Sequence, residues 1–367
     1  MFKTLALSPM RLTKNCGWTR DPVLKPDALP DNYAERYDAH TLIYSATYLA
    51  HARAIVLVCP KLKNLKILLS LGQFSSDQGS HKLHCIKHHR RHDEVWLQAN
   101  KRPTRLTLTS HGLEITCTVA EPDASMKGEV VLQTVSKDND LDWIHDWAAH
   151  YVRNQGVTHV LLFDNASTRY SAEDITETLR TVPGLSGATT VSVPLPFGPL
   201  GTKTPRAKAL FLSVGLLNTS RHQFAGNARA VLSCDIDEVL ISDSGRLLDE
   251  AERAFLGFAT ATVKPRFADL ADAQTPTHGD HVHKRLPDKP VKEKWCLLPQ
   301  GRLRTFVWDS HGVARYQFNW LSMRRGHRFY HCEHLSTHWG RRRGASHGET
   351  IVHDPRTAGD LARAGLR

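Results

Sequence analysis

Residues 130–165 read VVLQTVSKDNDLDWIHDWAAHYVRNQGVTHVLLFDN and carry the pattern of a strand, a helix and a second strand. The apolar run at 130–135 has the length of a buried strand. Polar residues at 138–140 can cap a helix whose apolar side chains recur every three or four positions, and Gly156 lies where that helix would end. A second apolar run follows at 157–163. This order predicts two parallel strands joined by a helix.

The same alternation continues along the chain. Ser171, with Asp174 three residues later, has the spacing of a capping box at the start of a second helix. We expect a strand at 188–195, a third helix beginning at Thr204-Pro205, and a strand at 228–234. Strands separated by helices of this length predict an α/β fold with a mainly parallel sheet, whose ligands bind beyond the carboxyl ends of the strands.

The length of 367 residues favours two domains. Residues 1–125 contain several short apolar or alternating segments separated by turn residues, which predicts a β-rich N-terminal domain. The alternating strands and helices place a second domain at 126–345. Residues 346–367 are expected to form a C-terminal tail.

The composition is that of an ordinary globular protein, with 41% hydrophobic and 23% charged residues, and it excludes a disordered or fibrous chain. The seven cysteines are scattered and never spaced C-x-x-C, so we expect reduced thiols rather than a disulfide framework. No apolar stretch approaches the roughly 20 residues that a membrane-spanning helix needs, and the N-terminus lacks the apolar region of a signal peptide. These features predict a cytoplasmic protein.

A formal net charge of +11 indicates attraction to anions: nucleic acid, an anionic membrane surface or a phosphorylated small molecule. The charge alone does not choose among them. Arginines concentrate near the C-terminus, where a stretch of twenty residues has one acidic residue, Glu333. Its arginines are Arg324, Arg325, Arg328, Arg341, Arg342 and Arg343. A solvated basic face and a phosphate-binding face explain this stretch equally well.

An acidic pair, Asp235 and Asp237, directly follows the apolar run at 228–234. In an extended chain, side chains two positions apart point to the same side, so both carboxylates can reach one cation at the strand end. Such oxygen ligands suit Mg²⁺ or Mn²⁺, whose coordination substrate phosphates often complete. An isolated D-x-D sequence is more often an ordinary surface turn. Its place beside a buried strand favours the functional interpretation, because unpaired acids there are costly.

Polar residues follow two other predicted strands, at Val135, Ser136 and Lys137 and at Asp164 and Asn165. The carboxyl ends of parallel strands meet at one edge of a sheet, so these residues are expected to lie along that edge. An acid or amide there can hydrogen-bond ribose hydroxyls or a base edge. Asp164 and Asn165 also fit an ordinary turn.

The order of these motifs resembles that of a known enzyme family. The motifs are Ser136-Lys137-Asp138-Asn139 before the tryptophan-bearing helix, Phe163-Asp164-Asn165-Ala166-Ser167-Thr168, and Asp235-Ile236-Asp237-Glu238. They are similar to the K-N-E, D-N-x-S and D-x-D-E motifs of A-fold glycosyltransferases of the family 2 and family 92 type. Farther on, Phe329-Tyr330-His331, Ser336, Trp339 and the run from Arg341 to Gly344 resemble the family's N-H-Y-x-x-K-S segment. The resemblance covers residues 130–345.

This resemblance implies a Rossmann-like A fold in residues 126–345. It implies transfer of a sugar from a nucleoside-diphosphate donor to a glycan or another hydroxyl acceptor, with Mn²⁺ or Mg²⁺ as cofactor. A role in polysaccharide biosynthesis follows, in the cytoplasm and at the inner face of the membrane. The oligomeric state stays open.

The candidate site residues fall into three groups. The metal ligands are Asp235 and Asp237 with His311, which follows the strand-like RTFVW, and His331, which matches the family segment. The donor-binding candidates are Val135, Ser136, Lys137, Asp164, Asn165, Arg206, Lys208 and Ser336, where Arg206 and Lys208 either clamp phosphate oxygens or form a solvated helix face. An inverting enzyme needs a carboxylate base, for which the candidates are Asp269, Asp309 and Glu333.

Two other functions stay open. A nucleotidyltransferase also places paired acids and a metal at a sheet edge, but it would be expected to have a glycine-rich phosphate loop, which residues 131–140 lack. A protein that binds nucleic acid would use the basic surface and would not depend on Asp235. For the glycosyltransferase, nucleic acid is not expected as a partner.

A histidine-rich stretch in the N-terminal domain suggests a further possibility. It contains His81, His84, Cys85, His88, His89 and His92, at spacings that can place imidazoles on one helical face around zinc. Lysines and arginines alternate with these histidines, and such cations disfavour a dication. A basic loop or strand face is therefore the favoured interpretation.

Overall fold

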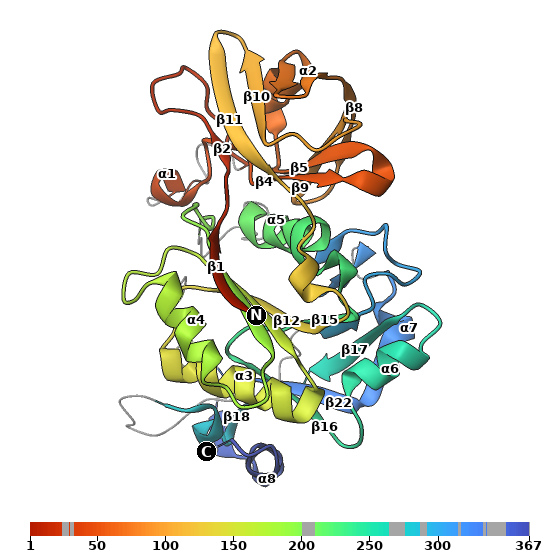
Figure 1. The fold of residues 1–367 in the computed structure, drawn as a ribbon. Coiled ribbons are helices and arrows are strands. Elements are labelled where there is room, and N and C mark those ends of the chain that lie inside the picture. Colours follow the sequence, from red (N-terminus) through yellow and green to blue (C-terminus); the bar gives the residue numbers. More distant parts are fainter. Residues whose placement is uncertain are drawn as a thin grey trace. The chain divides into compact units, whose positions relative to one another are not determined.

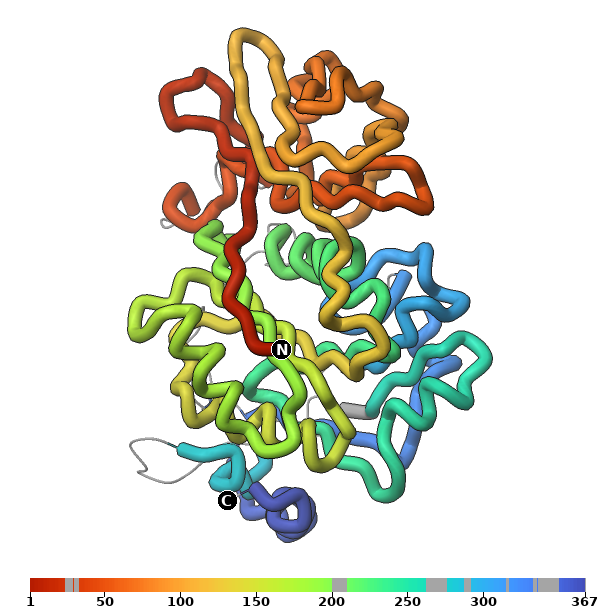
Figure 2. Tube along the Cα trace, viewed as in Figure 1, coloured from red at the N-terminus to blue at the C-terminus, as the bar shows by residue number. Residues whose placement is uncertain are grey.

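The computed structural model describes residues 1–23, 29, 33–199, 210–263, 276–286, 292–314, 317–332, 335 and 350–366. The chain forms two compact units, each built from separate stretches of sequence. Unit 1 comprises Met1–Leu5, Ser125–Val193 and Asn227–Arg367, and unit 2 comprises Ala6–Ala124 and Pro194–Gly226. Figure 2 shows the path of the chain through both units.

Unit 1 contains a nine-stranded sheet (Figure 1). In spatial order its strands are β1 (Phe2–Ala6), β14 (Gly187–Ser192), β13 (His159–Asp164), β12 (Val130–Ser136), β15 (Ala230–Ser233), β19 (Lys294–Leu297), β17 (Phe258–Val263), β22 (Met323–His331) and β16 (Glu238–Ser242). Strands β14, β13, β12 and β15 are parallel to one another. Beyond them, β19 is antiparallel to both β15 and β17, β17 is parallel to β22, and β16 is antiparallel to β22. The α/β class is confirmed, and the sheet is mixed because β19 and β16 run against their neighbours.

Three helices that pack on this sheet share its main apolar core. They are α3 (Leu141–Gln155), which connects β12 to β13, α4 (Ala172–Arg180), which connects β13 to β14, and α6 (Leu247–Arg253), which lies against β17. The predicted ends are confirmed: α3 stops at Gly156, whose φ is +70°, and Ser171 with Asp174 forms the capping box of α4. Alternate strand residues such as Val130 and Leu132 enter one apolar core with these helices, because side chains along a strand alternate between the faces of the sheet.

The first residues of the chain belong to the sheet of unit 1. The carbonyl oxygen of Met1 accepts a hydrogen bond from the Ala188 nitrogen at 3.0 Å, and the Met1 amino group donates to the Ser186 carbonyl at 2.8 Å. Residues 1–5 therefore extend the sheet beyond β14, whereas the sequence places them in the N-terminal domain. Backbone pairing of this kind depends little on side chains, so the sequence gives no sign of it.

The described residues at the C-terminal end form a strand and a helix, whereas the sequence predicts a tail. β23 (Thr350–His353) pairs with β18 (His283–Leu286), and α8 (Pro355–Arg363) follows. Leu361 of α8 is buried in an apolar cluster with Tyr330 of β22. The apolar face of this amphipathic helix explains why it packs onto the unit.

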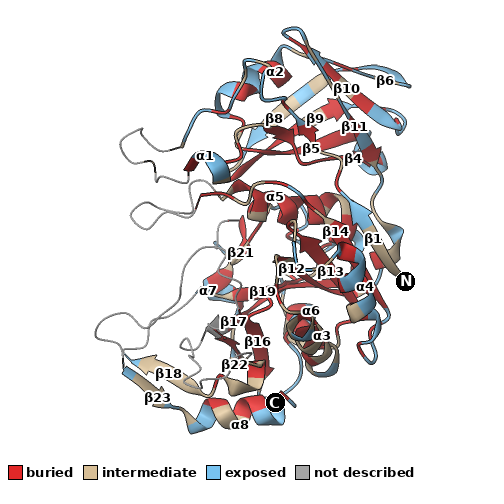
Figure 3. Cartoon of the chain, turned by 90° about the vertical axis from the view of Figure 1, so that its left-hand side faces the viewer, coloured by how far each residue is buried: buried red, intermediate tan, exposed pale blue. Residues whose placement is uncertain are grey.

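Unit 2 contains an eight-stranded sheet. In spatial order its strands are β7 (Gly79–His81), β6 (Gln73–Ser76), β10 (Arg105–Ser110), β11 (Leu113–Ala120), β4 (Ser45–Leu49), β5 (Ala54–Pro60), β9 (His92–Gln98) and β8 (Leu83–His88). Neighbouring strands are antiparallel except β11 and β4, which are parallel. The central strands of both sheets are largely buried (Figure 3).

Helix α5 (Phe211–Thr219) belongs to unit 2, although the sequence places it in the second domain. It contacts β5 and β9 and is buried on nearly every side. Gly215 approaches the ring of Tyr44 so closely that a Cβ atom would lie 2.5 Å from it, which explains a glycine inside a helix. The expected start of this helix at Thr204-Pro205 lies outside the described residues. A π-helical turn, η6 (Ser220–Phe224), follows α5.

The remaining described elements are short. They are α1 (Tyr33–Arg36), α2 (Lys66–Ser70), α7 (Asn319–Ser322), the strands β2 (Met10–Arg11), β3 (Thr41–Ile43), β20 (Trp308–Asp309) and β21 (Gly312–Val313), and the turns η2 (Ala50–Ala52), η3 (Lys63–Leu65), η4 (Ala124–Met126), η7 (Ala225–Asn227) and η8 (His278–Asp280). Among the described residues, no helix combines the length and the apolar character needed to cross a membrane.

Candidate active site

The acidic motif after β15 forms the turn that leads into β16. The Asp235 carbonyl accepts a hydrogen bond from the Glu238 nitrogen at 3.0 Å, which closes a four-residue turn. His278 Nε2 donates to the carbonyl of Ile236 at 2.9 Å and so holds the turn in place. The expected extended chain through Asp235 and Asp237 is therefore wrong. Because the backbone reverses, the Asp235 side chain is exposed and that of Asp237 is buried.

Lys294 binds two carboxylates of this turn. Its Nζ atom lies 2.8 Å from Oδ2 of Asp235 and 2.8 Å from Oε2 of Glu238. The pairing of β19 with β15 places it there, because Trp295 lies opposite Ser233 and Lys294 therefore lies beside the residues that follow β15. The side chains of Lys294 and Glu238 are each 3% exposed, so this ion pair is shielded from water.

Burial and charge together shift the pKa values of these three groups. Burial raises the pKa of Glu238 to about 8, although the Lys294 ammonium lowers it in opposition. For Asp235 the surrounding protein opposes ionisation, but the Lys294 ammonium outweighs this effect and lowers the pKa. Burial alone would lower the pKa of Lys294, and the two carboxylates raise it instead. Asp235 therefore stays ionised in mild acid, whereas Glu238 can hold a proton near neutral pH.

His331 lies against Asp237. The antiparallel pairing of β16 with β22 puts His331 opposite Glu238, and the Cys332 nitrogen donates to the Asp237 carbonyl at 2.7 Å. His331 Nε2 is 3.5 Å from Asp237 Oδ2. One ligand atom from each of Asp237, Glu238 and His331 lies within 4.8 Å of the other two, so the three groups can converge on one metal ion.

His311 is the fourth predicted metal ligand. Its Nδ1 donates to the Glu293 carbonyl at 3.2 Å, which places the ring proton on Nδ1. Burial and the Lys294 ammonium lower the pKa of His311 to about 3, against the opposing effect of Asp235. The ring is therefore neutral at neutral pH, which is the form that binds metals. His311 and His331 both act electrostatically on Asp235, and of the two histidines it is His331 that lies within 3.5 Å of an acid of the turn, Asp237.

The donor atoms of this neighbourhood are carboxylate oxygens and imidazole nitrogens. Divalent transition metals accept both kinds of ligand, whereas Mg²⁺ takes mainly oxygen, so Mn²⁺ fits better than Mg²⁺. Three carboxylates (Asp235, Asp237 and Glu238) lie near the ammonium of Lys294. A divalent cation therefore fits the charge of this turn, although Lys294 competes with it for Asp235 and Glu238.

The strand-end residues predicted to bind a nucleoside lie along one edge of the sheet. Ser136 and Ser192 both pair in register with Asp164. Asp164 is buried and accepts hydrogen bonds from the nitrogen and the hydroxyl of Ser167, and burial raises its pKa although these bonds lower it. The Asn165 nitrogen donates to the Ser136 carbonyl at 2.8 Å. Asp164 and Asn165 thus stabilise the turn after β13, at the edge where ligands of parallel sheets bind.

Of the other predicted site residues, some lie within the ranges that the structure describes and the rest lie outside them. Val135 and Lys137 are half-buried at the end of β12. Asp309 is buried, its Oδ1 accepts a hydrogen bond from the Ser310 nitrogen at 2.8 Å, and its carbonyl accepts one from Trp295 Nε1 at 3.0 Å. Its carboxylate therefore helps to close the turn between β20 and β21. Outside the described residues lie Arg206, Lys208, Asp269, Glu333, Ser336, Trp339 and Arg341–Arg343.

Lys294 is the site residue that the sequence does not predict. It stands directly before the apolar run WCLL at 295–298, so a lysine at the start of a buried strand is the signal that the sequence offers. Its contact with Asp235 joins residues 59 positions apart. Glu238 also has a larger part than the motif suggests, because its Oε2 accepts a hydrogen bond from the Asp235 nitrogen at 2.7 Å.

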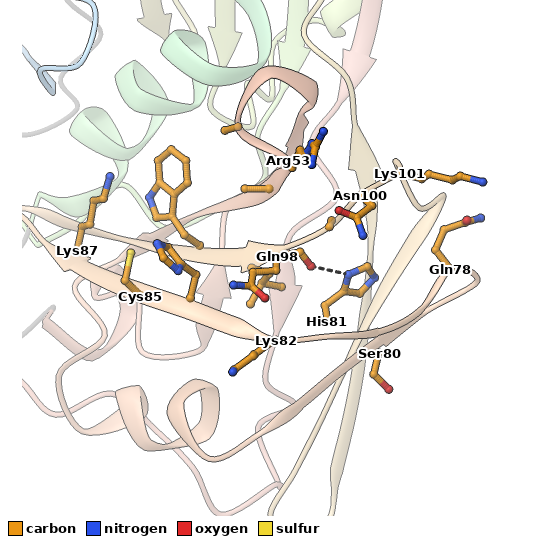
Figure 4. Close-up of a pocket in the computed structure, with 16 residues that line it drawn as sticks. Arg53, Gln78, Ser80, His81, Lys82, Cys85, Lys87, Gln98, Asn100 and Lys101 are labelled. Carbon is orange, nitrogen blue, oxygen red and sulfur yellow. Dashed lines mark hydrogen bonds between the residues drawn. The ribbon is translucent and has the colours of Figure 1, made fainter.

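Unit 2 contains a pocket of its own, with a volume of about 900 Å³ (Figure 4). The sixteen described residues that line it include Arg53, Lys82, Lys87 and Lys101 and no aspartate or glutamate. Trp96 also lines it, and Lys87 Nζ lies 4.1 Å from the centre of its ring. The pocket is therefore basic and has one aromatic surface.

Comparison with known proteins gives a distant similarity. The sequence matches no protein-family model and no curated protein. Among solved structures, the chain is similar to the bifunctional glycosyltransferase WbbM in its apo form, with 11% sequence identity and a TM-score of 0.24. The similarity covers 41% of this chain and 26% of WbbM, so the chain spans about a quarter of the length of that protein.

Proposed function

We propose that this protein is a metal-dependent glycosyltransferase with an A-type fold in unit 1. One observation carries the proposal: Asp237, Glu238 and His331 converge just beyond the carboxyl end of the parallel strand β15. Ligands of open α/β sheets bind at this edge. The order β14-β13-β12-β15 also matches half of a doubly wound, nucleotide-binding sheet, which supports a nucleotide as part of the substrate.

In this proposal the diphosphate of a nucleotide sugar binds at the turn between β15 and β16. Asp237, Glu238 and His331 would hold a divalent cation, with Asp235 and His311 as further candidate ligands, and the cation would act as a Lewis acid on the departing nucleoside diphosphate. Lys294 orients Asp235 and favours its ionised form. The edge formed by Val135–Lys137 and Asp164 contacts the nucleoside.

The acceptor in this proposal is a glycan or another molecule with a hydroxyl group. An inverting reaction needs a carboxylate to take the proton of that hydroxyl. Asp309 is the described candidate, and Asp269 and Glu333 are the others. The net charge of +11 supports contact with an anionic membrane surface, and we propose polysaccharide synthesis at the cytoplasmic face of such a membrane.

Incubation of the protein with a panel of nucleotide sugars, with and without Mn²⁺, tests this function. We expect Mn²⁺-dependent release of a nucleoside diphosphate and its loss in Asp237→Asn. Glu177→Gln, which alters an exposed carboxylate of α4, is the matched control and should keep the wild-type rate. Release of a sugar 1-phosphate instead would indicate nucleotidyl transfer. An unaltered rate in Asp237→Asn would overturn the proposal.

The basic pocket of unit 2 supports nucleic-acid binding as a second candidate function. Its cations can contact phosphates, and Trp96 can stack on a base. Within the described part of the chain, the side chains of Arg53, Lys82 and Lys101 form no ion pair. Gel shifts with single-stranded DNA and RNA at two salt concentrations test this function. If the pocket binds nucleic acid, the binding should weaken steeply as the salt concentration rises. The double variant Lys82→Glu/Lys101→Glu should abolish the binding, and Asp237→Asn should leave it unaltered.

A further inference from the structure

The histidine-rich stretch of unit 2 folds as strands and a turn, not as a helix. His81 ends β7, His84 and His88 lie in β8, and His92 begins β9. Helical spacing therefore does not apply, and the zinc arrangement that it suggests is absent from this stretch. A different subset of these histidines comes together, at the turn between β8 and β9.

His89 and His92 both face the carboxylate of Glu94. His89 Nε2 lies 3.9 Å from Glu94 Oε2, and His92 Nε2 lies 3.7 Å from Glu94 Oε1. The two imidazole rings stack, with centroids 4.6 Å apart and planes inclined by 23°. One ligand atom from each of the three residues lies within 4.8 Å of the other two.

The two histidines have polar atoms that the protein itself does not satisfy. The side chain of His92 is 1% exposed, and neither of its ring nitrogens has a hydrogen-bond partner among the described residues. Nε2 of His89 also has no hydrogen-bond partner among the described residues. A buried polar group without a partner costs about 1–3 kcal/mol. Burial also lowers the pKa of His92, which keeps the ring neutral and able to act as a ligand.

Other contacts fix the Glu94 carboxylate in this place. Trp96 Nε1 donates to its Oε2 at 3.2 Å, and His222 Nε2 donates to its Oε1 at 3.0 Å. Arg221 contacts Oε1 as well, and both Arg221 and His222 come from the π-helical turn η6. Burial would raise the pKa of Glu94, but the Arg221 guanidinium and the hydrogen bonds hold it well below its ordinary value.

We infer that His89, His92 and Glu94 form a binding site for a transition-metal ion of the zinc class. Two imidazoles and one carboxylate are a ligand set that zinc accepts, with a fourth position left for another ligand. The orienting contacts of Glu94 are those of a second coordination shell. Arg221 adds a positive charge beside the ion, so we expect weaker binding than in a site without such a neighbour. The ion would tie the β8–β9 turn to η6.

The test titrates Zn²⁺ into the full chain carrying Asp237→Asn, which removes the acidic cluster of unit 1 from the measurement. We expect about one equivalent to bind in competition with a chromophoric chelator, and Co²⁺ to give the visible absorption of a tetrahedral site. His92→Gln should weaken binding at least about tenfold. His84→Gln, at an exposed histidine of the same hairpin, should bind as the parent does.

Anomalous scattering at the zinc edge from crystals of the wild-type chain provides a test that needs no variant. A peak between His89, His92 and Glu94 is expected. Zinc that is bound elsewhere, no zinc binding at all, or binding that His92→Gln leaves unaltered would each overturn the inference. These outcomes do not depend on sugar transfer, so they leave the proposed function untouched.

Discussion

The ammonium nitrogen of Lys294 lies 2.8 Å from Oδ2 of Asp235, at the centre of the acidic turn that ends β15. The same nitrogen lies 2.8 Å from Oε2 of Glu238. The protein thus supplies one positive charge of its own to a group of carboxylates that can also hold a divalent cation. Binding of a divalent cation and the position of Lys294 are therefore coupled.

Removal of the ammonium in Lys294→Met should destabilise the protein by about 1–3 kcal/mol, because the buried Glu238 side chain, which holds a proton near neutral pH, loses a polar partner. The double variant Lys294→Met/Glu238→Met should recover part of this loss, since it removes both members of the buried polar pair. Urea unfolding at pH 7 measures both effects. A double variant no more stable than Lys294→Met would contradict this account of the pair.

The two candidate histidines should contribute unequally to metal binding. His331 Nε2 is 3.5 Å from Asp237, whereas Nδ1 of His311 donates to the backbone carbonyl of Glu293. We therefore expect His331→Gln to weaken Mn²⁺ binding by at least about tenfold, and more than His311→Gln does. Titration followed by the electron paramagnetic resonance of free Mn²⁺ measures this. The assignment of His331 fails if the order of the two variants is reversed.

His150 should make unit 1 sensitive to mild acid. Burial lowers its pKa from 6.5 to about 4, and its Nε2 donates to the Leu240 carbonyl at 2.8 Å. The unfolded chain therefore binds a proton that the folded chain excludes, and stability is lost as the pH falls from about 6.5 to 4. The loss amounts to about 3 kcal/mol at most for this group.

Urea unfolding at pH 7 and pH 5 tests the effect of His150. His150→Gln should be less stable at pH 7 but should lose less stability between the two pH values than the wild type. His145→Gln, at a more exposed position of the same helix, is the control and should keep the wild-type pH dependence. Equal pH dependence in His150→Gln and wild type would show that this ring does not titrate as described.

Asp360 should hold α8 against β22. Its Oδ2 accepts hydrogen bonds from Arg328 Nε at 2.8 Å and from Tyr330 Oη at 2.5 Å, and the side chains of Arg328 and Asp360 are 3% and 0% exposed. Asp360→Asn should cost about 1–3 kcal/mol, because a buried guanidinium loses one of its two charged partners, the other being Asp243.

Loss of Asp360 should also speed amide exchange in residues 355–363, where the helix separates from the strand. Arg363→Gln is the matched control, since Arg363 pairs with the same carboxylate from an exposed position. It should change stability by less than about 1 kcal/mol. Similar losses in the two variants would mean that burial of the Arg328 pair has no special effect.

The fold could be predicted from the sequence where the signals are local. Apolar periodicity and the caps at Gly156 and Ser171 locate β12, α3, β13 and α4. The position of Asp235 and Asp237 after a buried strand is also local. The turn that separates their side chains has no local signal, because it depends on a hydrogen bond between the Ile236 carbonyl and His278, 42 positions away.

The features that could not be predicted from the sequence depend on pairing between strands that are far apart in the chain. The place of Lys294 follows from the antiparallel match of β19 to β15, which needs a register that side-chain periodicity does not encode. His89 and His92 meet Glu94 because a hairpin, rather than a helix, joins them. The helix at 355–363, in contrast, has a local signal, since Pro355 occupies its first turn.

Unit 2 is completed by a part of the chain that is made late. Its strands β5 and β9 end by Gln98, whereas α5, which covers them, begins at Phe211. At a synthesis rate of about 5–20 residues per second, roughly 110 residues separate the two in about 5–20 s. During that interval the apolar surface of β5 and β9 is exposed on the ribosome. The nascent chain is therefore expected to need a chaperone over the same stretch of translation in which β12, β13 and β14 of unit 1 emerge.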